Sequence, residues 1–250
     1  MLAPRLLVAG ALLAALLGPS GATAQSPDPS PIAKVPPPVA GWPQFLHDAA
    51  HTGTTDAETT ITPKTVKRLA LAWWAPSGFN GSPSVADGVV YIGAGDGTLN
   101  AYAADCGKGG SECAPLWHGD AGSIVDWSSP AIADGLVTIG AGGDLTAWNV
   151  DCAADGGACT PRWTGSSGDI GYSSPAMADG LVAIGGNDGR LAVYDQACAT
   201  DGGTCTPLWT AAIGDEVHTS PAIADGTVYI GGQDGRLTAY PERCREDGGV

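Results

Sequence analysis

Short apolar segments with alternating polar neighbours recur through the second two thirds of the chain and predict β-strands. The segments VVYIG, LVTIG, LVAIG and TVYIG are rich in β-branched residues, which favour strands. Each follows an Ala-Asp-Gly turn. No window shows a sustained helical period, and 38 glycines and 19 prolines interrupt the chain. The pattern therefore predicts an all-β protein.

The octapeptide SSPAIADG at 128–135 returns in nearly the same form at 81–88, 173–180 and 219–226. Successive Ser-Pro pairs lie 47, 45 and 46 residues apart, a period typical of propeller blades. Each unit reads as four short strands, of which the third ends in an aromatic residue. We predict a β-propeller of four-stranded antiparallel blades. About four blades are visible, three full and one partial, near 82–127, 128–172, 173–218 and 219–250.

A tryptophan recurs in the fourth strand of the units, at Trp117, Trp163 and Trp209, and Trp73 precedes the first unit. A lone blade cannot bury both of its faces. We therefore expect these tryptophans to pack between neighbouring blades.

The aromatic-ended third strand, the short loop and the tryptophan of the last strand resemble the repeats of pyrroloquinoline-quinone-type (PQQ-like, quinoprotein-like) β-propellers. The leader at 42–74 also resembles the segment that precedes the blades of quinoprotein dehydrogenases. The resemblance implies a propeller domain at 42–250. Members of the family usually close a ring of roughly seven or eight blades. Either LALAWW at 69–74 closes a four-bladed ring here, or the sequence is a truncated piece of a longer propeller.

Six cysteines form three pairs with the same spacing of seven residues: Cys106 and Cys113, Cys152 and Cys159, and Cys198 and Cys205. In an exported chain, these pairs predict hairpin disulfides. The partner of Cys244 by this rule would be the residue after the last one, which favours truncation. We expect Cys244 to be unpaired, and Trp73 and Trp74 to lie outside the blade that contains Tyr240.

The N-terminal residues predict export. Arg5, an apolar run and the small-x-small pattern ATA at 22–24 form a signal peptide at 1–24, cleaved after Ala24. The apolar run is too short to span a bilayer, so we expect a secreted protein with no membrane span. Six prolines at 25–41 predict an extended linker. A net charge of −15 disfavours nucleic-acid partners.

Function is expected where equivalent positions of the repeats differ. The position three residues before each Ser-Pro proline is occupied in turn by Asn80, Trp127, Tyr172 and His218. The same loops add Asp126, Asp169, Asp215 and Glu216. Such an aromatic and acidic rim could bind a flat ligand or a hard cation. The alternative is an ordinary set of solvated loops on an acidic protein.

Two functions are consistent with the resemblance. The first is a non-catalytic module that binds an unknown protein or small-molecule ligand. The second is an oxidoreductase that uses PQQ and calcium, for which the resemblance implies calcium ligands, an aspartate base and often a disulfide between adjacent cysteines. No adjacent cysteines occur, and no residue matches the other roles, so we assign no catalytic residue or metal ligand and favour the binding module.

His47 and His51 are four residues apart and could share a metal ion if they lay on a helix. A packed leader segment is the favoured alternative.

Overall fold

The computed structural model describes residues 41–56, 60–76, 78, 81–152 and 156–244. The chain divides into Met1–Pro36 and Pro37–Val250, and all described residues belong to the second unit. The predicted signal peptide and the linker up to residue 40 lie outside them. Nearly all the regular structure consists of strands. In the described part, the helical segment is the single 3-10 turn η1 (Val66–Arg68), and no helix has the length and apolarity to cross a membrane.

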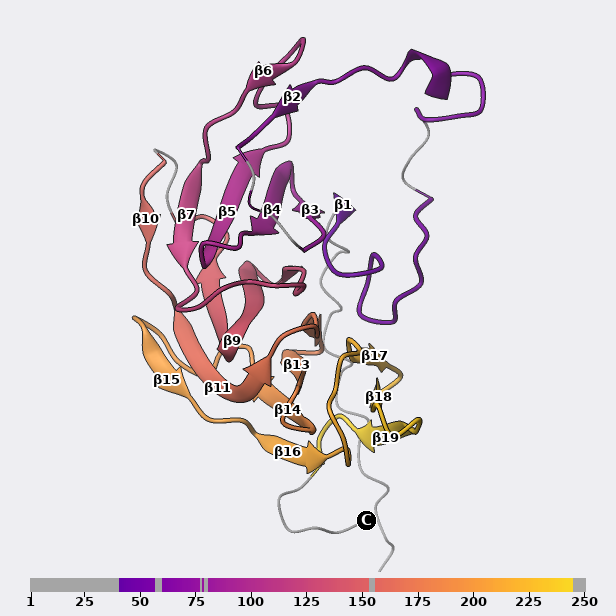
Figure 1. Ribbon diagram of the computed structural model, residues 1–250, viewed down its shortest axis with the longest axis vertical. Helices are drawn as coiled ribbons and strands as arrows, with labels where there is room; N and C mark the ends of the chain where they lie inside the picture. The colour runs from indigo at the N-terminus through magenta and orange to yellow at the C-terminus, as the bar shows by residue number, and fades with distance from the viewer. Residues whose placement is uncertain (1–40, 57–59, 77, 79–80, 153–155, 245–250) are drawn as a thin grey trace, which may run out of the picture. The chain divides into compact units, whose positions relative to one another are not determined.

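The strands form one antiparallel sheet for each predicted repeat, and we number the repeats 1 to 4 (Figure 1). Repeat 1 contains β3 (Ser84–Ala86), β4 (Val89–Gly93), β5 (Thr98–Ala103) and β7 (Trp117–Asp120). Repeat 2 contains β8 (Ala131–Ala133), β9 (Leu136–Asn149) and β11 (Trp163–Ile170). Repeat 3 contains β12 (Ala176–Ala178), β13 (Leu181–Gly186), β14 (Arg190–Asp195) and β16 (Trp209–Ala212). Repeat 4 contains β17 (Ala222–Ala224), β18 (Thr227–Gly231) and β19 (Leu237–Pro241).

In the described chain, five further short strands lie beside these antiparallel strands. They are β1 (Gly41–Trp42), β2 (Trp73–Trp74), β6 (Ser111–Glu112), β10 (Ala158–Cys159) and β15 (Gly203–Cys205). β10 pairs in parallel with β7 of repeat 1, and β15 pairs in parallel with β11 of repeat 2. Each of these two strands belongs to the disulfide hairpin of the following repeat. The hairpins therefore extend the sheet of the preceding repeat by one strand.

Repeat 2 differs from the prediction in one element. The sequence GGD predicts a turn between a second and a third strand, but β9 runs without a break from Leu136 to Asn149. The chain still reverses within β9. The hydrogen bond from the amide of Val150 to the carbonyl of Gly135 shows that the two ends of this strand lie side by side. Gly142, with φ of 54°, lies at the reversal and pairs with Ile170 of the long strand β11. This extra pairing extends the ladder across the turn.

Three apolar clusters lie between successive repeats and form the core. The first joins Leu99 and Trp117 of repeat 1 to Val137 and Ile139 of repeat 2. The second joins repeat 2 to repeat 3 around Trp163 and Tyr194, and the third joins repeat 3 to repeat 4 around Trp209. Trp117, Trp163 and Trp209 are buried in these clusters, between the sheets of neighbouring repeats. Each indole Nε1 donates to a carbonyl of the next repeat, at Val150, Gln196 and Glu242 respectively.

Hydroxyl groups explain why the octapeptide repeats. The amide of each Ser-Pro serine donates to the hydroxyl of the equivalent serine in the next repeat. This relay runs from Ser82 through Ser129 and Ser174 to Ser220, with N···O distances of 3.2, 2.9 and 3.0 Å. In repeats 2 to 4 the hydroxyl of the preceding residue accepts from a glycine amide of its own repeat, as Ser128 does from Gly140. One serine therefore links neighbouring repeats and the other fixes the sheet internally.

The segment Gly41–Ala49, which we call the inner segment, contacts the innermost strand of all four repeats. Its strand β1 pairs with β3, and Trp42 lies opposite Val85. The carbonyls of Pro43 and Ala49 accept from the amides of Ile132 and Ile223. The side chain of Gln44 bonds both backbone groups of Met177, at 2.8 and 2.9 Å. The four partners (Val85, Ile132, Met177 and Ile223) occupy the same place in the octapeptide.

The three predicted disulfides are present: Cys106–Cys113, Cys152–Cys159 and Cys198–Cys205. Replacing Cys152 and Cys159 together by serine should lower the free energy of unfolding by about 2–3 kcal/mol, because the unfolded chain regains the freedom of the closed loop. Urea denaturation under non-reducing conditions measures the change. The matched control is Cys244→Ser, since Cys244 is unpaired. Equal stability of the double variant and the control would contradict the prediction.

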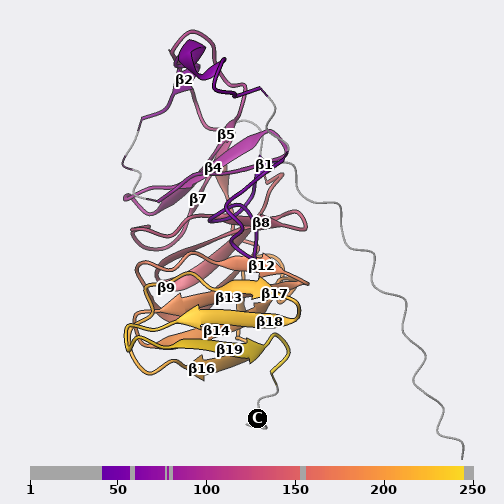
Figure 2. The same ribbon diagram turned by 90° about the vertical axis from the view of Figure 1, so that its right-hand side faces the viewer.

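The last sheet is incomplete, as expected from the sequence. β2 pairs with β6 of repeat 1 and not with the sheet that contains Tyr240, and Cys244 has no disulfide. Figures 1 and 2 show β2 and β19 at opposite ends of the described unit. In the described chain β19 pairs with β18 alone.

Candidate functional site

An exposed aromatic strip lies along the loops that lead into the innermost strands. We call it the rim strip and define it as Trp127, Tyr172 and His218 with the carboxylates Asp126, Asp169, Asp215 and Glu216. Trp127 is 57% exposed and Tyr172 is 45% exposed, although both are large apolar side chains. The rings of Tyr172 and His218 are in contact, with centroids 4.3 Å apart. The structure therefore brings two of the predicted rim residues together.

The neighbours of each rim residue fix its position. Ser173 follows Tyr172 and accepts from the amide of Gly185 at 3.0 Å, and Thr219 follows His218 and accepts from the amide of Gly231 at 3.2 Å. The amide of Trp127 donates to the carbonyl of Gly171, which links the loops of repeats 1 and 2. Because the next residues are held in the sheets, the aromatic side chains remain on the surface.

Carboxylates surround the aromatic residues. Oε2 of Glu216 lies 3.1 Å from Nε2 of His218. The side-chain amide of Gln233 is hydrogen-bonded to the same imidazole ring. Asp126 and Asp169 are exposed, and Asp215 accepts from the amide of Glu216. The strip therefore combines aromatic faces with negative charge, an arrangement that can bind apolar and cationic groups.

A hollow of about 340 Å³ adjoins the rim strip. Asp215 and Glu216 line one side, and Asn187, Asp188 and Arg190 line the other. Within the described chain, the buried atom Oδ1 of Asn187 has no hydrogen-bond partner. Asn187 therefore lines the hollow beside the rim strip, with its Oδ1 enclosed by the protein. Sequence reasoning missed Asn187, because it lies in the turn of repeat 3 and not in the loops between repeats.

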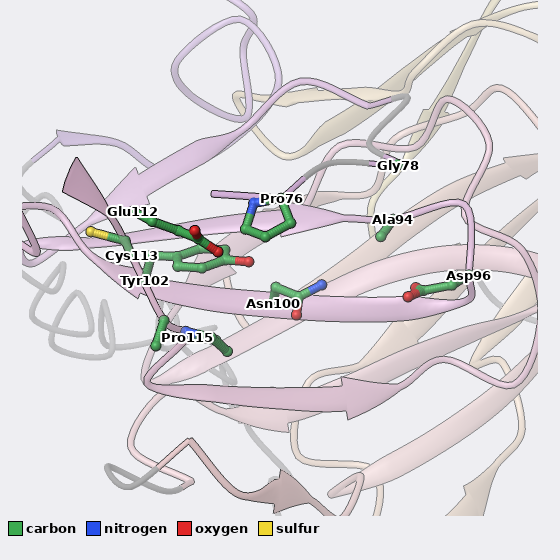
Figure 3. A pocket seen from close by; sticks show the side chains of 10 residues that line it. Pro76, Gly78, Ala94, Asp96, Asn100, Tyr102, Glu112, Cys113 and Pro115 are labelled. Atoms are coloured by element: carbon green, nitrogen blue, oxygen red, sulfur yellow. The ribbon is translucent and has the colours of Figure 1, made fainter. Parts of the chain in front are cut away.

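A larger hollow of about 650 Å³ lies on the face of repeat 1 that points away from repeat 2 (Figure 3). Asn100 and Tyr102 of β5 line it together with Asp96 and Pro76. Glu112 and Cys113 contribute from the disulfide hairpin. Desolvation by burial, followed by the nearby charge of Asp96, raises the pKa of Tyr102.

The remaining predicted residues lie elsewhere. Asn80 falls outside the described residues. His47 and His51 are not on a helix, since both have positive φ, at 85° and 57°. They pack instead against Trp42 and Phe45, as the packed-leader alternative expects. Burial lowers the pKa of His51, although the negative charge of Asp48 opposes this shift.

The described residues do not fit a site for calcium and a quinone. No group of three or more histidine, cysteine, aspartate or glutamate side chains gathers among them. The rim carboxylates contact His218 or the backbone or face solvent, and the disulfides join residues seven apart. We therefore derive no chemical step through such a cofactor.

Comparison with known proteins agrees with the sheet architecture. Residues 160–244 match the family model described as outer membrane protein assembly factor BamB. No curated protein matches the sequence. The quinohemoprotein alcohol dehydrogenase of Comamonas testosteroni aligns at 19% identity and TM-score 0.61, over 81% of this chain and 39% of the enzyme.

Two further structures align at 21% identity and TM-score 0.51 over 66% of this chain. BamB from Moraxella catarrhalis is covered over 50% of its length, so the chain spans about half of that protein. The computationally designed Ika4 protein is covered over 91% of its length. Together with the four repeated sheets and the tryptophans between them, these matches show the fold of a β-propeller, and residues 160–244 match a family of PQQ-like repeats.

Proposed function

We propose that the protein is an extracytoplasmic, non-catalytic binding module that recognises a protein partner through the rim strip. The observation that carries the proposal is the exposure of Trp127 and Tyr172 on loops held in place by the sheets. Tryptophan and tyrosine are enriched in the residues that dominate protein interfaces. A rigid scaffold beneath them lowers the entropy lost on binding.

The charge of the strip suggests the chemistry of the partner. Asp126, Asp169, Asp215 and Glu216 flank the aromatic residues, so a partner segment with basic and apolar side chains is complementary. The hollow that Asn187 and Asp188 line lies beside the strip and could accommodate a side chain of that segment. The family model matched by residues 160–244 describes an assembly factor, which also supports interaction with proteins. The three disulfides support an oxidising compartment.

Peptides selected on the wild-type protein from a random display library test the proposal. We expect the selected peptides to be rich in lysine or arginine next to apolar residues. Trp127→Ala and Tyr172→Ala should each raise their Kd about tenfold or more, because truncation of an aromatic anchor costs at least one to two kcal/mol. Fluorescence anisotropy with labelled peptides measures the Kd.

Trp74→Ala is the matched control, because Trp74 is also 45% exposed but lies outside the rim strip. Its Kd should equal that of the wild type. Peptides that bind the Trp127 and Tyr172 variants with unchanged affinity would refute a role for the strip.

The second candidate is a PQQ- and calcium-dependent oxidoreductase, supported by the structural likeness to a quinohemoprotein alcohol dehydrogenase. A ligand that binds only the folded state raises the melting temperature. Thermal unfolding with PQQ and calcium chloride separates the candidates. Our proposal predicts no shift, and a saturable rise would favour the oxidoreductase.

A further inference from the structure

One face of repeat 4 exposes positions that are buried in the other repeats. Leu237 is 76% exposed, whereas its equivalents Leu99, Leu145 and Leu191 are completely buried. Ala239 is exposed, whereas Ala101, Ala147 and Val193 are completely buried. In repeats 1 to 3 this face packs against the next repeat. The face of repeat 4 therefore has the composition of an interface between repeats.

The face of repeat 1 that points away from repeat 2 is also incompletely covered. Val90 and Ile92 are half-buried, whereas the equivalent pairs in repeats 2 and 3 are completely buried. The hollow of about 650 Å³ lies on this side of the sheet, beside Asn100 and Tyr102 (Figure 3). In repeats 2 to 4 the same face is covered by the preceding repeat. Among the described residues, only part of a preceding repeat covers this face of repeat 1.

β2 holds the position of a fourth strand in front of repeat 1. Nε1 of Trp73 donates to the carbonyl of Ala104 at 2.9 Å, as the tryptophans of repeats 1 to 3 donate to the equivalent carbonyl of the next repeat. The rings of Trp73 and Tyr102 lie 5.9 Å apart, the same separation as Trp163–Tyr194 and Trp209–Tyr240. β2 also pairs in parallel with β6, as β7 does with β10 and β11 with β15.

Repeat 4 has the remaining three strands of a complete sheet. In repeats 1 to 3 the third strand pairs antiparallel with the fourth, as β5 does with β7 and β14 with β16. In the described chain no strand pairs with the outer edge of β19. An unpaired edge carries free amide and carbonyl groups that favour pairing with another strand.

We propose that β19 of one copy of this chain pairs with β2 of a second copy, so that the two chains together complete a four-stranded sheet. The complete sheets set the register, since Ala101 lies opposite Trp117 and Val193 opposite Trp209. By the same register Ala239 of one copy lies opposite Trp73 of the other, Thr238 opposite Trp74, and Leu237 opposite Ala75. The exposed Leu237 then covers the apolar face of repeat 1.

One further feature fits this contact between copies. The serine relay begins at Ser82 and ends at Ser220, so the amide of Ser220 can donate to the hydroxyl of Ser82 of the second copy as the other members do. The rim strip takes no part in this contact, so the proposal is independent of the function proposed above.

Light scattering after size-exclusion chromatography, over a hundredfold range of protein concentration, tests the proposal. The wild type should increase in mass with concentration to at least two chains. Leu237→Asp should remain a single chain over the range, because it places a charge in the contact without disturbing a residue buried in one copy. Ile124→Asp is the matched control, since Ile124 is an exposed apolar residue (55%) on a loop outside the proposed contact. A wild type that remains a single chain, or a Leu237→Asp variant that assembles like the wild type, would overturn the proposal.

A cysteine pair identifies the strand that occupies the edge of β19. A single chain carries Thr238→Cys and Trp74→Cys with Cys244→Ser. The equivalent pair Asn100–His118 is directly cross-strand, a spacing that suits a disulfide. Mild oxidation should give a covalent product of two or more chains. A disulfide within one chain would show that the chain closes on itself, and no cross-link would show that the two strands do not meet. Either of these results rejects pairing between copies.

Discussion

Replacing Trp163 by alanine should lower the free energy of unfolding by about 3–5 kcal/mol. The indole is completely buried between repeats 2 and 3, where it packs on the ring of Tyr194 at 5.9 Å. Its removal leaves a cavity and also leaves the carbonyl of Gln196 without the hydrogen bond from Nε1. Urea denaturation followed by circular dichroism measures the loss.

The matched control for Trp163→Ala is Trp127→Ala, which removes an exposed indole and should change stability by less than about 1 kcal/mol. Both variants lose one tryptophan of the same size, so a difference between them reports the buried site of Trp163 together with its hydrogen bond to Gln196. Equal stability of the two variants would contradict the packing of Trp163 between repeats.

Replacing Gln44 by alanine should lower the free energy of unfolding by about 2–3 kcal/mol. Gln44 is buried and bonds both the amide and the carbonyl of Met177, so alanine leaves two backbone groups unsatisfied next to the core. Gln44→Glu should not restore stability, because a carboxylate accepts from the amide but repels the carbonyl. Urea denaturation at neutral pH measures both variants.

Gln233→Ala is the control for Gln44, since Gln233 is exposed and its side-chain amide bonds the exposed ring of His218 rather than a buried backbone group. It should leave stability within about 0.5 kcal/mol of the wild type. If Gln44→Ala were as stable as Gln233→Ala, the inner segment would not contribute to the stability of the repeats.

The repeated features of the fold could be predicted from the sequence, because the same physical requirement recurs in every unit. The spacing of Trp117, Trp163 and Trp209 predicted their packing between sheets, and the spacing of the cysteines predicted the three disulfides. The period of the Ser-Pro pairs predicted one antiparallel sheet for each repeat. In each case several equivalent residues gave the same signal.

The features that occur once could not be predicted. Nothing in the sequence near Gln44 indicates a partner 133 residues away, because a contact between the inner segment and the four innermost strands forms only after the repeats have assembled. The continuous strand β9 depends on pairing between Gly142 and Ile170, which local turn residues do not reveal. Of the rim residues, the contact between Tyr172 and His218 required the geometry of two repeats.

The exposed face of repeat 4 carries apolar residues at the same positions as the buried faces of repeats 1 to 3. Leu237 and Leu191 occupy equivalent positions, and only the presence of a following repeat distinguishes them. Apolar side chains exposed together on a sheet next to an unpaired edge favour association. The central claim is therefore that each sheet is stabilised by packing between two neighbours.

Hydrogen exchange measured by mass spectrometry tests this claim most directly, at a protein concentration at which the chain is a single copy. Peptides from β9 and β14, which lie between two neighbours, should exchange slowest, whereas the peptide over β19 should exchange much faster, because β19 is packed on one face and unpaired at its outer edge. Equal protection of β19 and β14 in the single copy would contradict the claim.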